Sequence, residues 1–113
     1  MKIDFSTVLQ DPDNPSEQAK DSKGVLITLG VIARSALNSE LQDERRNGED
    51  KYASYKLADK IRTSTKPLDL KADQIVLIKQ RIGKAYPAGV SGQCWDLLEP
   101  PPVEDEPEVE KAA

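Results

Sequence analysis

The widest apolar stripe in the chain lies within residues 70–86. Its hydrophobic residues recur at intervals of three and four positions, the spacing of one helix face. They are Ile75, Ile78, Ile82 and Tyr86, with Val76, Leu77 and Ala85 widening the stripe. Because so wide a stripe is seldom left in water, we expect this segment to form the central helix of a small core.

The ends of this helix carry recognisable signals. Lys71 stands at the cap position with Gln74 three residues later, a degenerate capping box because a hydroxyl residue usually comes first. Asp73 suits the positive end of the helix dipole, and Pro87 stops the helix. Gly83 lies inside the run at a cost of roughly 1 kcal/mol relative to alanine, which we interpret as a sign of tight packing.

Three further segments are predicted to be helical from their apolar spacing. The first follows a cap at Thr28, and its expected inner face is Leu29, Ile32, Ala33, Ala36, Leu37 and Leu41. The second covers residues 49–62, with an expected inner face of Ala53, Leu57, Ala58 and Ile61. The third covers residues 88–99, with an expected inner face of Val90, Cys94, Leu97 and Leu98.

Two segments near the N-terminus predict strands. Residues 2–9 alternate in hydrophobicity, so that one face gathers Ile3, Phe5 and Leu9. Residues 23–28 form a second short apolar run, and we expect the two segments to pair as a β-hairpin. Residues 10–22 between them are polar and contain two prolines, so we expect a mobile loop.

These elements predict one small α+β domain over residues 1–99, mainly helical, in which an N-terminal two-stranded β-hairpin packs on three to four helices. With 113 residues, 37% hydrophobic content and 4% aromatic content, its core must be modest and largely aliphatic. The composition changes at Pro100. Residues 100–113 hold four prolines and five acidic residues, which predicts a disordered acidic tail.

Charge is unevenly distributed along the chain. Residues 45–84 carry 11 basic and 5 acidic residues, although the net charge of the whole chain is −4. Such a basic segment can follow the phosphates of a nucleic acid, or it can be a solvated helix face on which neighbouring charges pair. Interleaved acidic residues and the lack of a stacking aromatic series favour the solvated face.

Several kinds of catalytic chemistry lack the residues that they need. The chain has no histidine and a single cysteine, which excludes histidine-activated nucleophiles, a structural zinc site and an intramolecular disulfide. The glycine pattern of a phosphate-binding loop is missing, and no segment reaches the ~20 apolar residues of a membrane helix. We therefore expect a protein that is not an enzyme, uses no cofactor or metal and has no membrane partner.

The candidate residues for binding a partner are aromatic or basic. Trp95 falls off the best inward stripe of its helix, and tryptophan, tyrosine and arginine are enriched at interaction hot spots. The alternative for Trp95 is that it covers the edge of the core. The candidate set is Trp95, Tyr52, Tyr55, Arg45, Arg46, Lys56 and Lys60.

Four segments form a pattern that covers about two thirds of the chain: LGVIARSAL at 29–37, EDKYASYKLADKI at 49–61, LDLKADQIVLIKQRIGKAY at 68–86 and VSGQCWDLLE at 90–99. Together they resemble a group of small uncharacterised bacteriophage and prophage proteins, and the least generic piece is Gly92-Gln93 with the Leu-Leu-Glu that ends the last segment. The resemblance implies a phage gene product that acts in the host cytoplasm or in virion assembly. It transfers no catalytic residue.

The sequence therefore favours a non-enzymatic protein-interaction module of phage origin, such as an assembly factor or an accessory virion protein. Its expected partner is a phage structural protein or a host protein in the bacterial cytoplasm. The alternative is a nucleic-acid-binding regulator that uses residues 45–84. The oligomeric state does not follow from these patterns.

Overall fold

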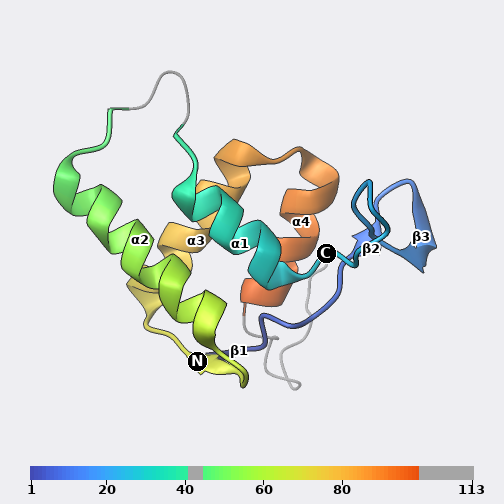
Figure 1. Cartoon of the computed structure of the whole chain (residues 1–113), viewed down its shortest axis with the longest axis horizontal. Helices are drawn as coiled ribbons and strands as arrows, with labels where there is room; N and C mark the ends of the chain where they lie inside the picture. The colour runs from blue at the N-terminus through green and yellow to red at the C-terminus, as the bar shows by residue number, and fades with distance from the viewer. Residues whose placement is uncertain (41–44, 100–113) are drawn as a thin grey trace, which may run out of the picture.

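The structure is a computed structural model that describes residues 1–40 and 45–99. In these residues the helices are α1 (Leu29–Asn38), α2 (Gly48–Thr63), α3 (Ala72–Ala85) and α4 (Ala88–Leu98), and the strands are β1 (Lys2–Ile3), β2 (Gln10–Asp11), β3 (Asn14–Gln18) and β4 (Leu68–Asp69). The chain is a mainly helical α+β protein, as predicted (Figure 1). The predicted tail at residues 100–113 and the predicted core residue Leu41 lie outside the described residues.

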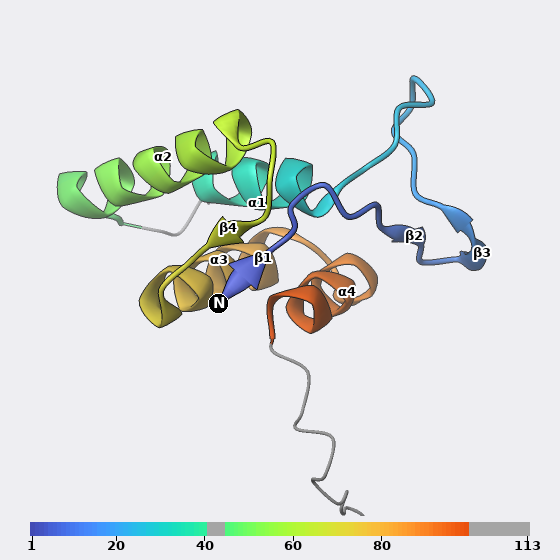
Figure 2. The same ribbon diagram turned by 90° about the horizontal axis from the view of Figure 1, so that it is seen from below.

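The four described helices form two layers, with α1 and α2 in one layer and α3 and α4 in the other (Figure 2). α1 packs against α2 beside it and against α3 across the layers, and α3 in turn packs against α4. The most deeply buried large side chains of α1 and α3 are Leu29, Leu37, Ile78 and Ile82. The central position predicted for residues 70–86 is therefore confirmed, and α1 shares it.

The helix starts follow the capping chemistry of the sequence. The Thr28 hydroxyl accepts a hydrogen bond from the Val31 N–H at 3.2 Å, as expected for the cap of α1. Asn47 caps α2 in the same way, because its side chain accepts from the Asp50 N–H at 2.7 Å. At α3 the Gln74 side chain accepts from the Lys71 N–H at 2.9 Å. Of the two hydrogen bonds of a capping box, this is the one that Gln74 makes back to the cap residue.

The predicted pairing of residues 2–9 with residues 23–28 is only partly correct. β1 pairs instead with β4, in antiparallel register with Ile3 opposite Leu68. The chain then turns at Asp4, whose carboxylate accepts from the Ser6 N–H at 2.9 Å, and this turn ends the first strand. The expected pairing survives only as a short ladder, in which the Leu9 N–H donates to the Ile27 carbonyl at 2.9 Å.

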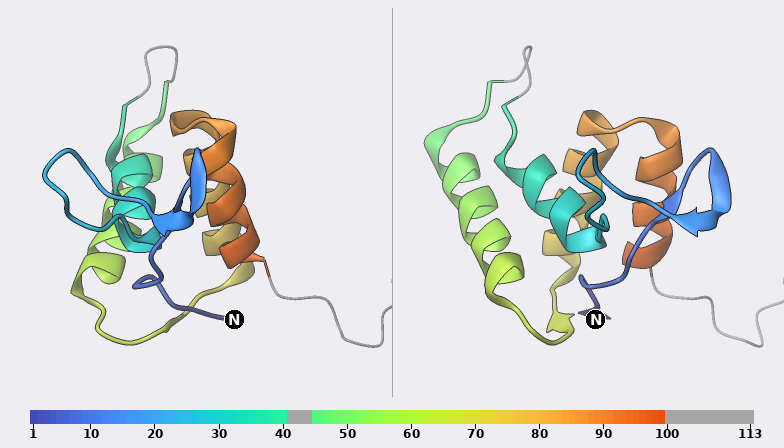
Figure 3. Two further views of the ribbon diagram at one scale, coloured as in Figure 1. Left: turned by 90° about the vertical axis from the view of Figure 1, so that its right-hand side faces the viewer. Right: turned by 45° about the vertical axis from the view of Figure 1, so that its right-hand side comes forward.

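The segment predicted as a loop at residues 10–22 contains a small hairpin of β2 and β3. Every residue of β3 is exposed, and the hairpin extends away from the helices (Figure 3). The chain turns again at Gly24, where φ is +83°, a conformation that favours glycine. The sequence pattern could not reveal this hairpin, because both of its strands are polar and bury no side chain that would mark a period of two residues. The mobility of the segment stays a prediction.

Three residues predicted to lie on apolar inner faces are exposed instead, and one of them is Val76 of α3, which is 50% exposed. Ala53 of α2 lies on the surface, and the neighbouring Ser54 is buried in its place. Leu97 of α4 is exposed, whereas Cys94 and Leu98 are fully buried. Each of these side chains is apolar, but the turn of the helix carries its position away from the buried face.

Candidate protein-binding surface on α2

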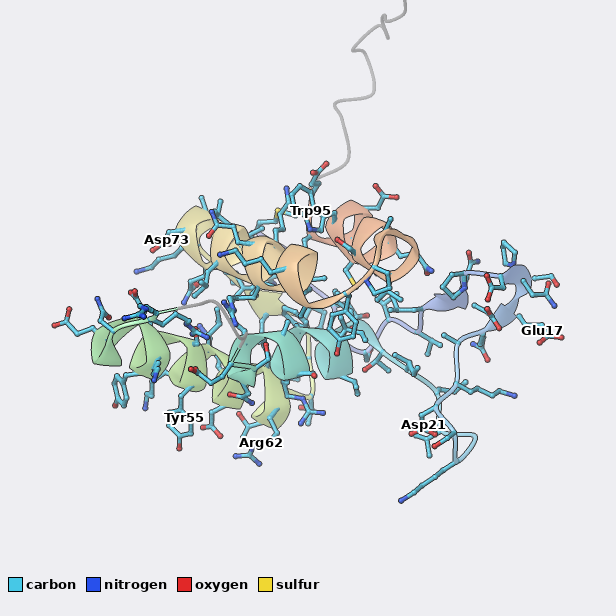
Figure 4. The ribbon with its side chains drawn as sticks, turned by 90° about the horizontal axis from the view of Figure 1, so that it is seen from above. Glu17, Asp21, Tyr55, Arg62, Asp73 and Trp95 are labelled. Carbon is cyan, nitrogen blue, oxygen red and sulfur yellow. The ribbon has the colours of Figure 1, made fainter. Side chains whose placement is uncertain are left out.

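Two tyrosines stand side by side on the surface of α2. Tyr52 is 62% exposed and Tyr55 is 57% exposed, and their ring centroids lie 6.3 Å apart. The ammonium of Lys56 lies 5.9 Å from the centre of the Tyr52 ring, within range of a cation–π contact. Figure 4 shows Tyr55 on the side of α2 that faces away from α3. Tyr52, Tyr55 and Lys56 are called the tyrosine face below.

The two predicted arginines differ in their surroundings. Arg45 is exposed. Arg46 donates from Nη1 to the Ser39 carbonyl at 3.3 Å, and its Nη2 donates to the buried Ser54 hydroxyl. Arg46 therefore ties the end of α1 to α2, and this bond explains why a serine occupies the buried position in α2.

A second arginine lies at the end of α1, and the sequence pattern does not indicate it. Arg81 of α3 is only 4% exposed, and its Nη2 donates to the Ser39 carbonyl at 2.8 Å while its Nε donates to the Ala36 carbonyl at 3.3 Å. α1 has no basic residue in its own last turn, so Arg46 and Arg81 supply positive charge where the helix dipole is negative. A sign of its burial in the sequence is that Arg81 directly precedes Ile82, a residue of the apolar stripe.

Trp95 lies on the opposite side of the molecule from Tyr55 (Figure 4). Its indole Nε1 donates to the Lys79 carbonyl at 3.0 Å, and the Lys79 ammonium lies 4.6 Å from the ring centre. Lys79 also pairs with Glu99 at 2.8 Å. Trp95, 38% exposed, thus joins α4 to α3, and the predicted candidates do not form one site. Of the two interpretations of Trp95, the contacts favour covering the edge of the core.

A groove of about 510 Å³ runs along α2 beside the tyrosine face. All of its lining residues come from two helices: Ala53, Lys56, Leu57, Asp59 and Lys60 of α2, and Asp73, Gln74 and Leu77 of α3. Two predicted residues, Lys56 and Lys60, therefore lie at the groove, and Lys56 also belongs to the tyrosine face. These residues form the α2–α3 groove.

Cys94, the single cysteine of the chain, lies in the core and away from this surface. Burial raises the pKa of the Cys94 thiol to about 11, so the thiol is neutral near pH 7. Nucleophilic attack requires the thiolate. The residue thus acts as a small apolar side chain, in line with its place on the inner face of α4.

No described helix has both the length and the apolar character needed to cross a membrane. Within residues 1–40 and 45–99, no three side chains of the metal-binding types gather closely enough to hold a metal ion. A comparison of the chain with protein-family models, curated proteins and solved structures finds no match.

Proposed function

We propose that this chain is a non-enzymatic protein-interaction module that contacts its partner through the tyrosine face of α2. The observation that carries the proposal is the pair of adjacent, largely exposed rings of Tyr52 and Tyr55. Tyrosine supplies a large, stiff contact surface with a polar end at low entropic cost, which is why it is enriched at interfaces. The opposite face of α2 is occupied by the core, so these rings are available to another molecule.

The resemblance to small phage proteins supports a partner of a particular origin. We infer a phage structural protein or a bacterial host protein, with the chain acting as an assembly factor or an accessory virion protein. The contacts within the basic segment weigh against the nucleic-acid alternative. Lys79 pairs with Glu99, Lys51 with Glu40 and Arg62 with Asp59. The charges of these three cations are thus offset within the protein, which reduces the charge available for phosphates.

The test is a comparison of the wild-type chain with the double variant Tyr52→Ala/Tyr55→Ala. Both side chains are exposed, so the variant is expected to fold. Proteins captured from bacterial lysate by the wild-type chain are identified, purified and titrated against both forms by calorimetry. We expect the double variant to bind the purified partner at least ~10-fold more weakly, as for the loss of hot-spot tyrosines.

The matched control is Val25→Ala/Val31→Ala, which removes two exposed apolar side chains elsewhere on the surface. This control is expected to retain wild-type affinity. Equal affinity of the tyrosine variant and the wild-type chain would place the partner on another surface. Saturable, strongly salt-dependent binding of duplex DNA, with no protein partner, would favour the nucleic-acid-binding regulator instead.

A further inference from the structure

The α2–α3 groove combines an apolar floor with basic side chains along one rim. Leu57 is buried and Leu77 is partly buried, and together with Ala53 they form the apolar part of the lining. Lys56 and Lys60 stand on the α2 rim, one helical turn apart, which places their side chains on the same side of the helix. α1 packs against both helices and so holds the two walls in place.

The rim lysines differ from the other cations of α2 in their ion pairs. Lys51 pairs with Glu40, and Arg62 pairs with Asp59. Among the residues that the structure describes, neither Lys56 nor Lys60 forms an ion pair; Lys56 contacts the Tyr52 ring. Two neighbouring ammonium groups at one groove therefore favour an occupant that brings negative charge.

One of the two acidic residues that line the groove is already paired. Asp59 accepts from Arg62. Asp73 lies in the first turn of α3, where the positive end of the helix dipole stabilises a carboxylate. In Figure 4, Asp73 lies at the start of α3, across from α2. Because Arg62 offsets Asp59, the charges left at the groove are those of Lys56 and Lys60 on the α2 rim and of the single carboxylate Asp73 on the α3 side, and the positive charge is in excess.

The positive character continues along α3 beyond the groove. A second hollow of about 290 Å³ shares Ala53 and Leu77 with the groove, and its charged lining residues are Arg46, Asp50, Arg81 and Lys84. Arg46 and Arg81 bind the end of α1, as described above. Their charges still add to the potential along this surface, because a hydrogen bond to a neutral carbonyl leaves the guanidinium charged.

We propose that the α2–α3 groove binds an acidic segment of the partner protein. Its carboxylates face Lys56 and Lys60, and an apolar side chain between them rests on Leu57 and Leu77. This inference rests on the proposed function, and it names the chemistry of the partner that the tyrosine face contacts. Lys56 belongs to both surfaces, so a segment in the groove would continue directly onto the Tyr52 ring.

The probe is a fluorescein-labelled nonapeptide of the repeat Glu-Leu-Glu, and its uncharged control has the repeat Gln-Leu-Gln. Binding to the full chain is measured by fluorescence anisotropy at low and at physiological salt. We expect saturable binding of the acidic peptide only, weakened by salt because the contacts are exposed. The variant Lys56→Glu/Lys60→Glu should bind it about tenfold more weakly, because two attractive pairs become repulsive.

The matched control is Lys23→Glu/Lys66→Glu, which changes the net charge equally at two exposed positions outside the groove. It should bind within about twofold of the wild-type chain, and equal weakening in both variants would show a non-specific charge effect. The proposal is also overturned if the wild-type chain does not bind the acidic peptide or binds it only after removal of residues 100–113. A dimer that requires Lys56 and Lys60 would likewise overturn it, by assigning the groove to a second copy.

The two proposals can fail separately. If Tyr52→Ala/Tyr55→Ala abolishes binding of the natural partner and Lys56→Glu/Lys60→Glu leaves it unchanged, the groove inference is wrong and the tyrosine face stands. If the lysine variant alone abolishes binding, and Lys60→Glu, which lies outside the tyrosine face, reproduces the loss, the groove is the contact surface and the tyrosine rings are not. If both variants bind like the wild-type chain, neither surface contacts the partner.

Discussion

The side-chain amide of Gln93 pairs with both backbone polar groups of Gln10. The Gln10 N–H donates to Gln93 Oε1 at 2.8 Å, and Gln93 Nε2 donates to the Gln10 carbonyl at 2.8 Å. A side chain of α4 thus takes the place that a neighbouring strand would have beside β2. Next to it, Pro12 lies so close to Gly89 that a Cβ at Gly89 would fall 2.8 Å from the proline Cβ. The hairpin is therefore joined to α4 by two contacts.

Gln93→Ala should loosen the hairpin and lower the free energy of unfolding by about 1 kcal/mol, because two exposed hydrogen bonds to the Gln10 backbone are lost. Amide hydrogen exchange at Gln10 should become faster than in the wild-type chain. The control Gln80→Ala changes the same residue type at an exposed position of α3 and should leave exchange at Gln10 unchanged. Wild-type protection at Gln10 in Gln93→Ala would show that the hairpin is held by other contacts.

Arg81→Met should lower the free energy of unfolding by about 2–3 kcal/mol, because the Ser39 and Ala36 carbonyls lose a charged donor at a buried position. Arg81→Lys should recover only part of this loss, since an ammonium lacks the fork geometry of the guanidinium. Urea unfolding measures both variants. Arg62→Met is the control: it removes an exposed arginine that pairs with Asp59, and its cost should stay below ~1 kcal/mol.

The sequence predicted the helices more accurately than the strands, and the reason lies in how each is specified. A helix such as α3 bonds within itself, so local spacing and Pro87 define it. A strand needs a partner that the local pattern does not identify. The alternation of residues 2–9 correctly marked Ile3, Phe5 and Leu9 as buried, but the partner of β1 turned out to be β4, more than 60 positions later.

The candidate surface was predicted only in part, for a similar reason. Residue type pointed to Tyr52, Tyr55 and Lys56, and helix spacing alone is enough to place them on one exposed side of α2. The α2–α3 groove depends on how two helices separated by a turn and a strand pack, which no local pattern encodes. The internal role of Arg46 also depends on a tertiary contact, since its acceptor at Ser39 belongs to the end of α1.

Gly83→Ala should raise the free energy of unfolding by up to about 1 kcal/mol, because alanine is the better helix former. The sequence suggested tight packing at Gly83, but an added Cβ would lie 3.5 Å from Trp95 Cζ2, an ordinary contact distance. Gly30→Ala is the contrasting variant. Its Cβ would lie 3.0 Å from the Phe5 carbonyl oxygen, so it should destabilise. Thermal unfolding should show shifts of opposite sign, and a fall in both melting temperatures would contradict the geometry at Gly83.

Ile78→Ala should lower the free energy of unfolding by ~2–5 kcal/mol, as for other truncations of buried aliphatic side chains. Ile78 is fully buried at the centre of α3. Val76→Ala on the same helix is the control, because Val76 is 50% exposed and should cost less than ~0.5 kcal/mol. Denaturant unfolding compares the two variants. A cost for Ile78→Ala as small as that of the control would mean that α3 is not central to the core.

Cys94 should make the stability of the protein depend on pH only in alkaline solution. Burial raises the pKa of its thiol from 9.0 to about 11. In the unfolded chain the thiol loses its proton as the pH passes 9, whereas in the folded protein it keeps the proton until about pH 11. The unfolded state therefore binds fewer protons between these values, and stability falls as the pH rises through this window. Below it, the thiol is protonated in both states and contributes no pH dependence.

The measurement compares the wild-type chain with Cys94→Ala from pH 7 to 11. The variant loses packing at every pH, but it lacks the thiol, so only the wild-type chain should show this titration. The difference between their unfolding free energies should be constant up to pH 8. It should then change by about 2–3 kcal/mol towards pH 11, the value that two pKa units represent.

At pH 8 a thiol reagent should label the wild-type chain only through unfolding, so its labelling rate should increase with urea. Rapid labelling without urea, or a pH-independent difference, would show that Cys94 is accessible to water.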